Sequence, residues 1–189
     1  MSNQPEDLPK GPNPWKRLTR RVAYENRWLT VFHDEVKRPD GNDGIYGVVH
    51  FENRSVGVVP LDPSKRVLLV GQFRYTIGRF SWEIPAGGAP VGEDTEATAR
   101  RELKEETGYS AGSMQLLLHA HMSNSVTDEE GYCYLATDLV AGNASPEGTE
   151  RIELRWVPFD EALRRIESGE ITDALSILAL QQTGLRVLR

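Results

Sequence analysis

The sequence predicts an α+β protein in which a small antiparallel β-sheet precedes the main domain. Short β-branched stretches bounded by turn residues fill most of the chain up to Pro85, and they predict strands. A helical segment at 94–107 follows, and two more helical segments lie near the end of the chain. With 189 residues and 39% hydrophobic content, the chain is long enough to bury one core. We therefore expect one main domain with a small addition on its N-terminal side.

Composition and charge argue against several classes of function. The net charge of −6 is unlike a nucleic-acid-binding surface, which is normally basic. No stretch approaches the roughly 18 apolar residues of a membrane span, and the first residues lack the apolar segment of a secretory signal. The single Cys133 excludes an intramolecular disulfide and fits a reducing compartment. We expect a cytoplasmic protein that binds neither a membrane nor a nucleic acid.

The first 52 residues predict two different parts. Residues 1–14 contain several prolines among polar residues and bury too little apolar surface to fold, which predicts a flexible N-terminal arm. A β-sheet subdomain is expected at 15–52, because strand-like stretches alternate there with turn residues. The expected strands are 17–24, 28–38 and 45–52. The main domain is then expected at 53–189.

Turn residues also separate the expected elements of the main domain. Strands are expected at 55–61, 66–75, 80–84, 114–122, 132–139 and 154–157. Helices are expected at 94–107, 159–166 and 172–183. A glycine-rich loop at 86–93 leads into the first helix, which Gly108 ends. Asp160 is the expected cap of the second helix, and Gly184 is the expected end of the third.

Three glutamates of the first helix indicate a metal site. Glu102, Glu105 and Glu106 stand at i, i+3 and i+4, which places their carboxylates on one side of the helix, about 5–6 Å apart at Cβ. At an effective dielectric constant near 20, each pair repels by roughly 3 kcal/mol. A hard divalent cation with oxygen ligands offsets this repulsion. We expect these glutamates to bind Mg²⁺, with Mn²⁺ as the alternative.

The spacing around these glutamates resembles the Nudix hydrolase box. Gly87 is followed after five residues by Glu93, and after seven more by Arg101-Glu102-Leu103-Lys104-Glu105-Glu106-Thr107-Gly108-Tyr109. Every fixed position of the box is present, and only Tyr109 replaces the usual aliphatic residue. The resemblance implies an α/β/α sandwich around a mixed β-sheet and a pyrophosphohydrolase activity. The alternative is a solvated acidic helix, the commoner meaning of a glutamate-rich helix.

The resemblance also implies roles for residues within the box. In the family, a carbonyl next to the first glycine and the helix glutamates hold the metal, which implicates Ala86, Glu102, Glu105 and Glu106. Gly87 lets the backbone come close to the site. Glu93 lies near the helix start, where a negative charge is favourable with the helix dipole. Arg101 lies one turn from Glu105 and can orient a glutamate by pairing with it.

Residues upstream of the box are similar to the ADP-ribose pyrophosphatase and nucleoside-diphosphate-sugar hydrolase branch of the family. The matching stretches are Gln72-Phe73-Arg74 and Trp82-Glu83-Ile84-Pro85-Ala86-Gly87. The resemblance implies that Arg74 contacts substrate phosphates and that Glu83 helps to bind substrate or metal. A purely structural role is the alternative for each. Members of this branch are commonly homodimers in which the N-terminal segment takes part, so the resemblance implies a homodimer with 15–52 as its dimerisation subdomain. Trp28 is a candidate stacking platform for the base, with an ordinary β-sheet aromatic as the alternative.

The loop at 123–129 resembles the loop that supplies the catalytic base in this branch. Register with the following strand places Glu129 on the base, with Asp128 and Glu130 as alternatives. Asn124 stands where the ADP-ribose enzymes have a proline, and an asparagine does not stiffen a loop as a proline does. This departure motivates GDP-mannose, or another nucleotide sugar, as the alternative substrate.

The expected function follows from these residues taken together. We expect Mg²⁺-dependent hydrolysis of the diphosphate bond of a nucleoside diphosphate sugar, with ADP-ribose giving AMP and ribose 5-phosphate as the first expectation. The alternative from another class is a nucleotide-sugar sensor that keeps the fold without the chemistry. Such a protein would usually lack box carboxylates or the loop base, and this chain has them all.

Overall fold

The computed structural model of the chain describes residues 11–145 and 151–187. The chain divides into two compact units between His50 and Phe51. Most of the arm expected at 1–14 lies outside the described residues, and positions 11–14 form no helix or strand.

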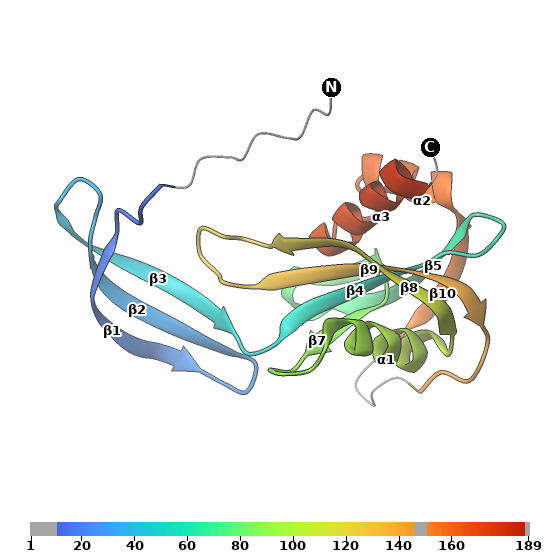
Figure 1. Cartoon of the computed structure of the whole chain (residues 1–189), viewed down its shortest axis with the longest axis horizontal. Coiled ribbons are helices and arrows are strands. Elements are labelled where there is room, and N and C mark those ends of the chain that lie inside the picture. The colour runs from blue at the N-terminus through green and yellow to red at the C-terminus, as the bar shows by residue number, and fades with distance from the viewer. Residues whose placement is uncertain (1–10, 146–150, 188–189) are drawn as a thin grey trace, which may run out of the picture. The chain divides into compact units, whose positions relative to one another are not determined.

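The N-terminal unit is a three-stranded sheet (Figure 1). Its strands, in sheet order, are β1 (Lys16–Glu25), β2 (Leu29–Lys37) and β3 (Asp43–Phe51). β1 runs antiparallel to β2 and places Arg20 opposite Asp34. The Arg20 guanidinium donates two hydrogen bonds of 2.7 Å to the buried Asp34 carboxylate. All three strands expected from the sequence are present.

This sheet buries little of its own surface. Every residue of β1 is exposed, and among residues 11–50 only Thr30, Asp34 and Val36 are buried. The large apolar side chains exposed in this unit are Trp15, Leu18, Val22, Tyr24, Trp28 and Ile45. Its stability therefore depends mainly on ladder hydrogen bonds and cross-strand pairs such as Arg20–Asp34.

The C-terminal unit contains two β-sheets. The first has the order β7 (Ala86–Ala89), β4 (Arg54–Pro60), β9 (Glu130–Val140), β8 (Ser110–His121). The second has the order β10 (Glu153–Pro158), β5 (Arg66–Arg74), β6 (Arg79–Glu83). A short 3-10 helix, η1 (Tyr75–Ile77), joins β5 to β6. β4 is parallel to β9 and antiparallel to β7, so the first sheet is mixed.

Helices cover both faces of the mixed sheet (Figure 1). They are α1 (Thr95–Thr107), α2 (Phe159–Glu167) and α3 (Ala174–Val187). α1 packs on one face, where Leu103 joins a buried cluster with Val58. α3 covers the other face, where Leu175 packs in the cluster that contains Val59, and α2 packs against α3 and the second sheet. The two valines follow each other in β4 and so point to opposite faces. This arrangement agrees with the expected α/β/α sandwich. Within the described ranges, no helix is long and apolar enough to cross a bilayer.

Three local expectations were wrong. The glycine-rich stretch is not a loop throughout, because Ala86–Ala89 pairs with β4 as strand β7. Gly184 does not end α3, which continues to Val187 because the glycine lies where α3 packs against Phe159 of α2. Asp160 does not cap α2, since Pro158 takes that position without a side-chain hydrogen bond.

Cys133 is a core residue of β9. It is fully buried and its thiol is free. Burial, with a further contribution from the negative charge of Asp173, raises the pKa of the Cys133 thiol to about 12. The thiol is therefore neutral at physiological pH and acts as a small apolar side chain.

Candidate active site

The glutamate-bearing helix α1 is fixed at both ends by its own sequence. The Asp94 side chain accepts a hydrogen bond of 3.0 Å from a backbone N–H of the first turn and caps the N-terminus. At the C-terminus, Gly108 adopts the left-handed conformation with φ of 78°. Leu103 is fully buried against the sheet, which sets the rotation of the helix about its axis. This rotation turns Glu102 and Glu106 toward β7.

These two glutamates contact consecutive residues of β7. Glu106 is 3% exposed and accepts a hydrogen bond of 3.1 Å from the Ala86 N–H. One helical turn earlier, Glu102 lies against Gly87, where an added Cβ would stand 2.1 Å from the Glu102 Cδ. The position requires glycine because any side chain would displace the carboxylate. The fold thus brings Ala86, Gly87, Glu102 and Glu106 together.

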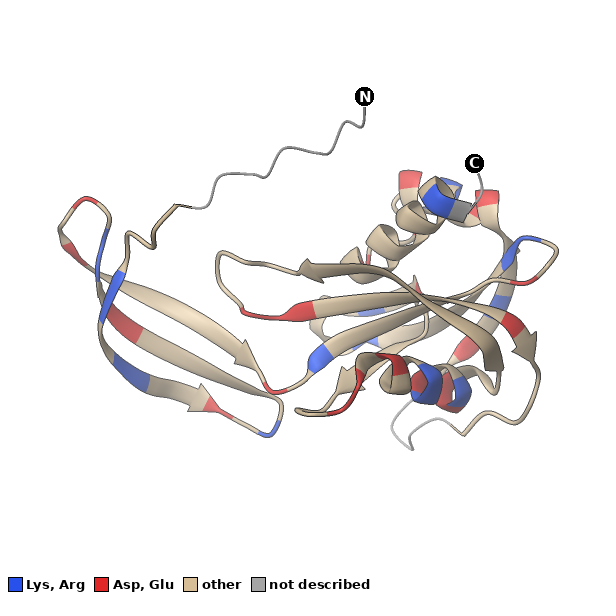
Figure 2. Cartoon of the chain, in the orientation of Figure 1, with Lys and Arg blue, Asp and Glu red and all other residues tan. Residues whose placement is uncertain are grey.

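Arg101 links the acidic residues along α1. Its hydrogen bonds go to Glu102 (2.7 Å), Glu105 (3.0 Å), the Gly88 carbonyl (3.2 Å) and Glu93 (3.4 Å). Burial opposes the charged form, but the carboxylates, Glu102 above all, hold the pKa of Arg101 above its usual value. Figure 2 shows acidic and basic residues next to one another along this helix. Arg101 therefore offsets part of the repulsion that the glutamate spacing predicts.

Arg74 and Glu83 form a bidentate pair between the neighbouring strands β5 and β6. The Arg74 Nε lies 3.0 Å from Oε1 of Glu83, and Nη2 lies 2.5 Å from Oε2. Hydrogen bonding to Glu83 raises the pKa of Arg74, and the charges of Asp173 and Glu106 add to this effect. Glu106 belongs to α1, so Arg74 and the glutamate helix share one electrostatic environment.

The two partners of this pair differ in exposure. Glu83 is 4% exposed, whereas the Arg74 side chain is 41% exposed. Within the described part of the chain, Nη1 of Arg74 makes no hydrogen bond and can meet an incoming anion. The buried carboxylate thus fixes an arginine that is partly exposed and keeps one donor group for a further partner.

The Glu129 side chain is hydrogen-bonded to β4, the strand next to β7. Ser55 of β4 donates a hydrogen bond of 2.7 Å to the Glu129 Oε1. In the sheet register, Ser55 lies opposite Gly88 and thus two residues from Ala86. Neighbouring strands are about 4.8 Å apart. The Glu129 carboxylate therefore reaches the strand adjacent to the one that carries Ala86.

The two alternative bases are held differently. Asp128 accepts a hydrogen bond of 3.2 Å from the Phe51 N–H. Glu130 accepts one of 2.8 Å from the Tyr132 hydroxyl and lies 3.4 Å from Nε2 of His119. His119 is on β8, the edge of the sheet opposite to β7. Glu130 is therefore directed away from the glycine strand.

The donor atoms beside β7 suit a hard divalent cation. They are the carboxylates of Glu102 and Glu106 and the carbonyl of Ala86, with the Glu105 carboxylate linked to Glu102 through Arg101. Mg²⁺ prefers oxygen ligands of this kind. In the described ranges, no three His, Cys, Asp or Glu side chains are already grouped around a cation position. Arg101 bonds one oxygen of Glu102 and one of Glu105, so the second oxygen of each carboxylate can still ligate a cation.

Trp28 belongs to the N-terminal unit. The residue is 58% exposed, and the guanidinium of Arg27 lies 4.1 Å from the ring centroid. This contact occupies one face of the indole. The role of Trp28 as a stacking platform for the base stays a prediction.

Two residues near the site lie outside all the motifs that identified the expected site residues. Ser55 is one hydroxyl residue in a strand, and only the fold brings it to Glu129. Asp173 accepts a hydrogen bond of 2.8 Å from the Ser176 N–H at the start of α3 and also acts electrostatically on Arg74. The Asp-x-x-Ser spacing signals a helix cap, which could have located Asp173 but not its closeness to Arg74.

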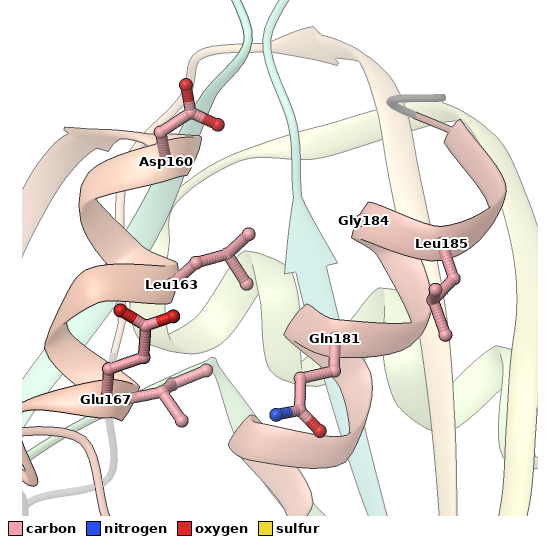
Figure 3. Close-up of a pocket in the computed structure, with 7 residues that line it drawn as sticks. Asp160, Leu163, Glu167, Gln181, Gly184 and Leu185 are labelled. Atoms are coloured by element: carbon pink, nitrogen blue, oxygen red, sulfur yellow. The ribbon is translucent and has the colours of Figure 1, made fainter.

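A cavity of about 470 Å³ lies between α2 and α3 (Figure 3). It is lined by apolar residues such as Leu163 and Leu185, with Asp160, Glu167 and Gln181 among the polar ones. None of its lining residues is an expected site residue. The cavity is therefore not formed by the residues around β7.

Comparison with known proteins matches both units of the chain. The NUDIX domain matches residues 52–175, and the nucleoside diphosphate sugar hydrolase N-terminal domain matches residues 15–49. The chain is 36% identical to an ADP-ribose pyrophosphatase of Mycobacterium tuberculosis over 167 residues, which is 86% of this chain and 80% of the relative.

Two further matches extend over most of the chain. The sequence is 34% identical to a CMP-5'-(N-acetyl-N-hydroxy-3-aminopropyl)phosphonate hydrolase of Streptomyces rubellomurinus, over 90% of this chain and 83% of the relative. A crystal structure of an ADP compounds hydrolase superposes with a TM-score of 0.83 at 20% identity, covering 93% of this chain and 95% of the other. The expected fold is confirmed.

Proposed function

Because the chain belongs to the NUDIX hydrolase family, we propose that it hydrolyses the diphosphate bond of a nucleoside diphosphate sugar in the presence of Mg²⁺. One observation carries the proposal. Glu102 and Glu106 of α1 lie against Gly87 and Ala86 of β7, and the charge of Glu106 acts on Arg74. These contacts support one site that combines the proposed metal-binding face with the proposed phosphate-binding arginine. The match of residues 15–49 to an N-terminal domain of nucleoside diphosphate sugar hydrolases supports the substrate class.

The carboxylate face of α1 would hold the metal. Glu102, Glu105, Glu106 and the carbonyl of Ala86 supply the oxygen ligands, with Mg²⁺ as the first candidate and Mn²⁺ as the alternative. When bound there, the cation offsets the charge of the diphosphate and polarises the attacked phosphorus. Glu93 and Arg101 orient the glutamates through the hydrogen bonds of Arg101.

Arg74 would bind the substrate phosphates. Glu83 holds the Nε and Nη2 side of the guanidinium in a bidentate pair, which leaves Nη1 for the substrate. An arginine fixed in this way loses little conformational freedom when it contacts an anion, which strengthens binding. Glu83 therefore contributes by orienting Arg74, whether or not it also contacts the metal.

Glu129 would act as the general base. Its carboxylate would take the proton of the attacking water, a contribution of typically 10²–10⁴-fold. Water adds to one phosphorus, the bridging P–O bond breaks, and a nucleoside monophosphate and a sugar phosphate leave. The link of Glu129 to β4 supports this assignment over Glu130, which is directed toward β8.

ADP-ribose remains the first candidate substrate, with AMP and ribose 5-phosphate as products. Asn124 stands where the ADP-ribose enzymes have a proline, but backbone hydrogen bonds also restrict the conformation of this loop. The Ser123 carbonyl accepts hydrogen bonds of 3.0 Å from the N–H groups of Val126 and Thr127. These bonds order the loop without proline. GDP-mannose is the alternative that Asn124 motivates.

We also propose that the protein is a cytoplasmic homodimer. Residues 15–52 would form the dimerisation subdomain and residues 53–189 the hydrolase domain. The exposed apolar side chains of the N-terminal sheet support the dimer, because a second copy would remove them from water. Sedimentation of the full chain tests this proposal. We expect twice the chain mass of 21.2 kDa, and a monomer at micromolar concentration would contradict it.

A substrate panel tests the proposed activity. ADP-ribose, GDP-mannose, a CMP-linked phosphonate and a dinucleoside polyphosphate are incubated with the protein, with Mg²⁺ or with EDTA, and the products are separated by chromatography. We expect AMP and ribose 5-phosphate from ADP-ribose only with the metal. Turnover of GDP-mannose alone would change the substrate. Tight binding of a nucleotide sugar without turnover of any compound would favour the sensor.

A further inference from the structure

Ser55 and Glu129 are in contact although they are 74 residues apart in the sequence. The Ser55 Oγ donates a hydrogen bond of 2.7 Å to the Glu129 Oε1. Both side chains are half-buried. A hydroxyl that donates to a carboxylate forms a charge-assisted bond, which is stronger and more directional than a neutral one.

The backbone of Glu129 is fixed independently of Ser55. Its N–H donates to Oγ1 of Thr127 at 2.8 Å, and its carbonyl accepts from the Met122 N–H at 3.1 Å. The side chain is different, because among the described residues only Ser55 donates a hydrogen bond to its carboxylate. Without the hydroxyl, the Glu129 backbone would keep its place while the carboxylate would sample several rotamers.

The position of Ser55 in β4 makes this hydroxyl effective. Its register partners are Gly88 on β7 and Gly131 on β9, so no neighbouring side chain in the sheet covers it. Ser55 and Gly57 point to the same face of the sheet, and Gly57 lies opposite Ala86. The hydrogen bond therefore holds the Glu129 carboxylate at the start of β4, on the face of the sheet to which the Ala86 side chain points and on which Leu175 of α3 packs against Gly57.

From this geometry we infer that Ser55 is a positioning residue for the catalytic base. Its hydroxyl holds the Glu129 carboxylate in the orientation that receives the proton of the attacking water. The inference rests on the proposed function, since it requires Glu129 to act as the base. It adds a residue from β4, outside both the glycine-to-glycine box and the base loop, to the catalytic arrangement.

A set of variants measured with the nucleotide sugar that the wild-type protein hydrolyses tests this role. Ser55→Ala should lower kcat by about 10- to 100-fold, the effect of one hydrogen bond to a charged group, and should leave KM within about 2-fold. Ser55→Thr keeps the hydroxyl and should recover most of the rate. Ser113→Ala, an exposed serine of β8, is the matched control and should equal wild type. Ser55→Cys, which lacks a strong donor, replaces the alanine variant if that one does not fold.

A double-mutant cycle separates positioning from general destabilisation. In the Glu129→Gln background, Ser55→Ala should cause no further loss, because the group it positions is already gone. An equal loss in both backgrounds, or a Ser55→Ala rate within 2-fold of wild type, overturns the inference while leaving the proposed function in place. A wild-type protein that hydrolyses none of the nucleotide sugars overturns the proposed function, and this inference with it.

Discussion

The Glu102 carboxylate fills the space that a side chain at Gly87 would occupy. An added Cβ at Gly87 would lie 2.1 Å from both Cδ and Oε1 of Glu102. β7 and α1 therefore touch at a point where one partner is backbone and the other a carboxylate. The contact explains why the site needs glycine here for space, since the φ of Gly87 lies outside the left-handed region.

Gly87→Ala should displace Glu102 and impair catalysis more than folding. A displacement of about 1 Å at a catalytic group can cost about 100-fold in rate, so we expect kcat to fall by about that factor. The overpacked contact should lower the free energy of unfolding by about 1–3 kcal/mol. Steady-state kinetics and urea unfolding measure the two effects.

The matched control for that substitution is Gly47→Ala. A Cβ at Gly47 would meet nothing within 4 Å, and its φ is not left-handed. This variant should keep the wild-type rate and stability. A Gly87→Ala protein with unchanged kcat would show that Glu102 can leave β7 without consequence, against the account.

The contribution of the Arg74–Glu83 pair to stability can be measured separately from its contribution to activity. Arg74→Ala leaves the buried Glu83 carboxylate without its partner, which should lower the free energy of unfolding by about 1–3 kcal/mol. The double variant Arg74→Ala/Glu83→Gln should regain most of that stability, because a neutral amide costs less to bury.

In these variants, kcat/KM should not recover together with the free energy of unfolding. If Arg74 binds the phosphates, kcat/KM stays low in the double variant although its stability has returned. Urea unfolding and steady-state kinetics on the three proteins give the comparison. Recovery of activity together with stability would assign Arg74 to structure alone.

The Arg20–Asp34 pair predicts a pH-dependent stability of the N-terminal sheet. Hydrogen bonds from Arg20 hold the pKa of Asp34 below its usual value of 3.8. A carboxyl whose pKa is lowered by folding stabilises the protein above the unfolded pKa, and loses this effect as the pH falls through the folded pKa. Asp34→Asn should therefore cost about 1–3 kcal/mol at pH 7 and progressively less below pH 3.8.

Urea unfolding at a series of pH values checks this prediction. Asp43→Asn is the control, because Asp43 pairs with Lys37 at the surface and its side chain is 75% exposed. That surface pair should contribute less than about 1 kcal/mol at any pH. An Asp34→Asn deficit that is the same at pH 7 and pH 3 would contradict the role of the charge.

The sequence predicted most elements because their signals are local. The Asp94 cap and the Gly108 stop bound α1 within a few residues, and β-branched stretches between turn residues mark the strands. β7 was missed because alanine and glycine have low strand propensity, so this strand exists only through its pairing with β4. Gly184 was misread because a glycine inside a helix can serve close packing, here against Phe159, instead of ending the helix.

The site residues that the sequence predicted are those with a local signal, and the ones it missed are brought together only by the fold. Fixed spacing identified the α1 glutamates, Arg101 and Gly87, whose contacts are made with the adjacent β7. The bidentate pairing of Arg74 with Glu83 was not foreseen, since it depends on the β5–β6 register. Ser55 could not be found at all, because the bond to Glu129 joins two strands that are distant in the sequence.

The most direct test of the account is the Mg²⁺-dependent turnover of Glu106→Gln. Glu106 is buried against the Ala86 N–H, and glutamine keeps the acceptor oxygen, so the fold should persist. Loss of a metal-binding charge should lower kcat by about 100-fold or more and weaken Mg²⁺ binding in calorimetry. Glu96→Gln, which changes an outward glutamate of α1 paired with Arg100, should retain wild-type values. A folded Glu106→Gln protein with near-wild-type turnover and Mg²⁺ affinity would contradict the assignment of α1 as the metal-binding helix.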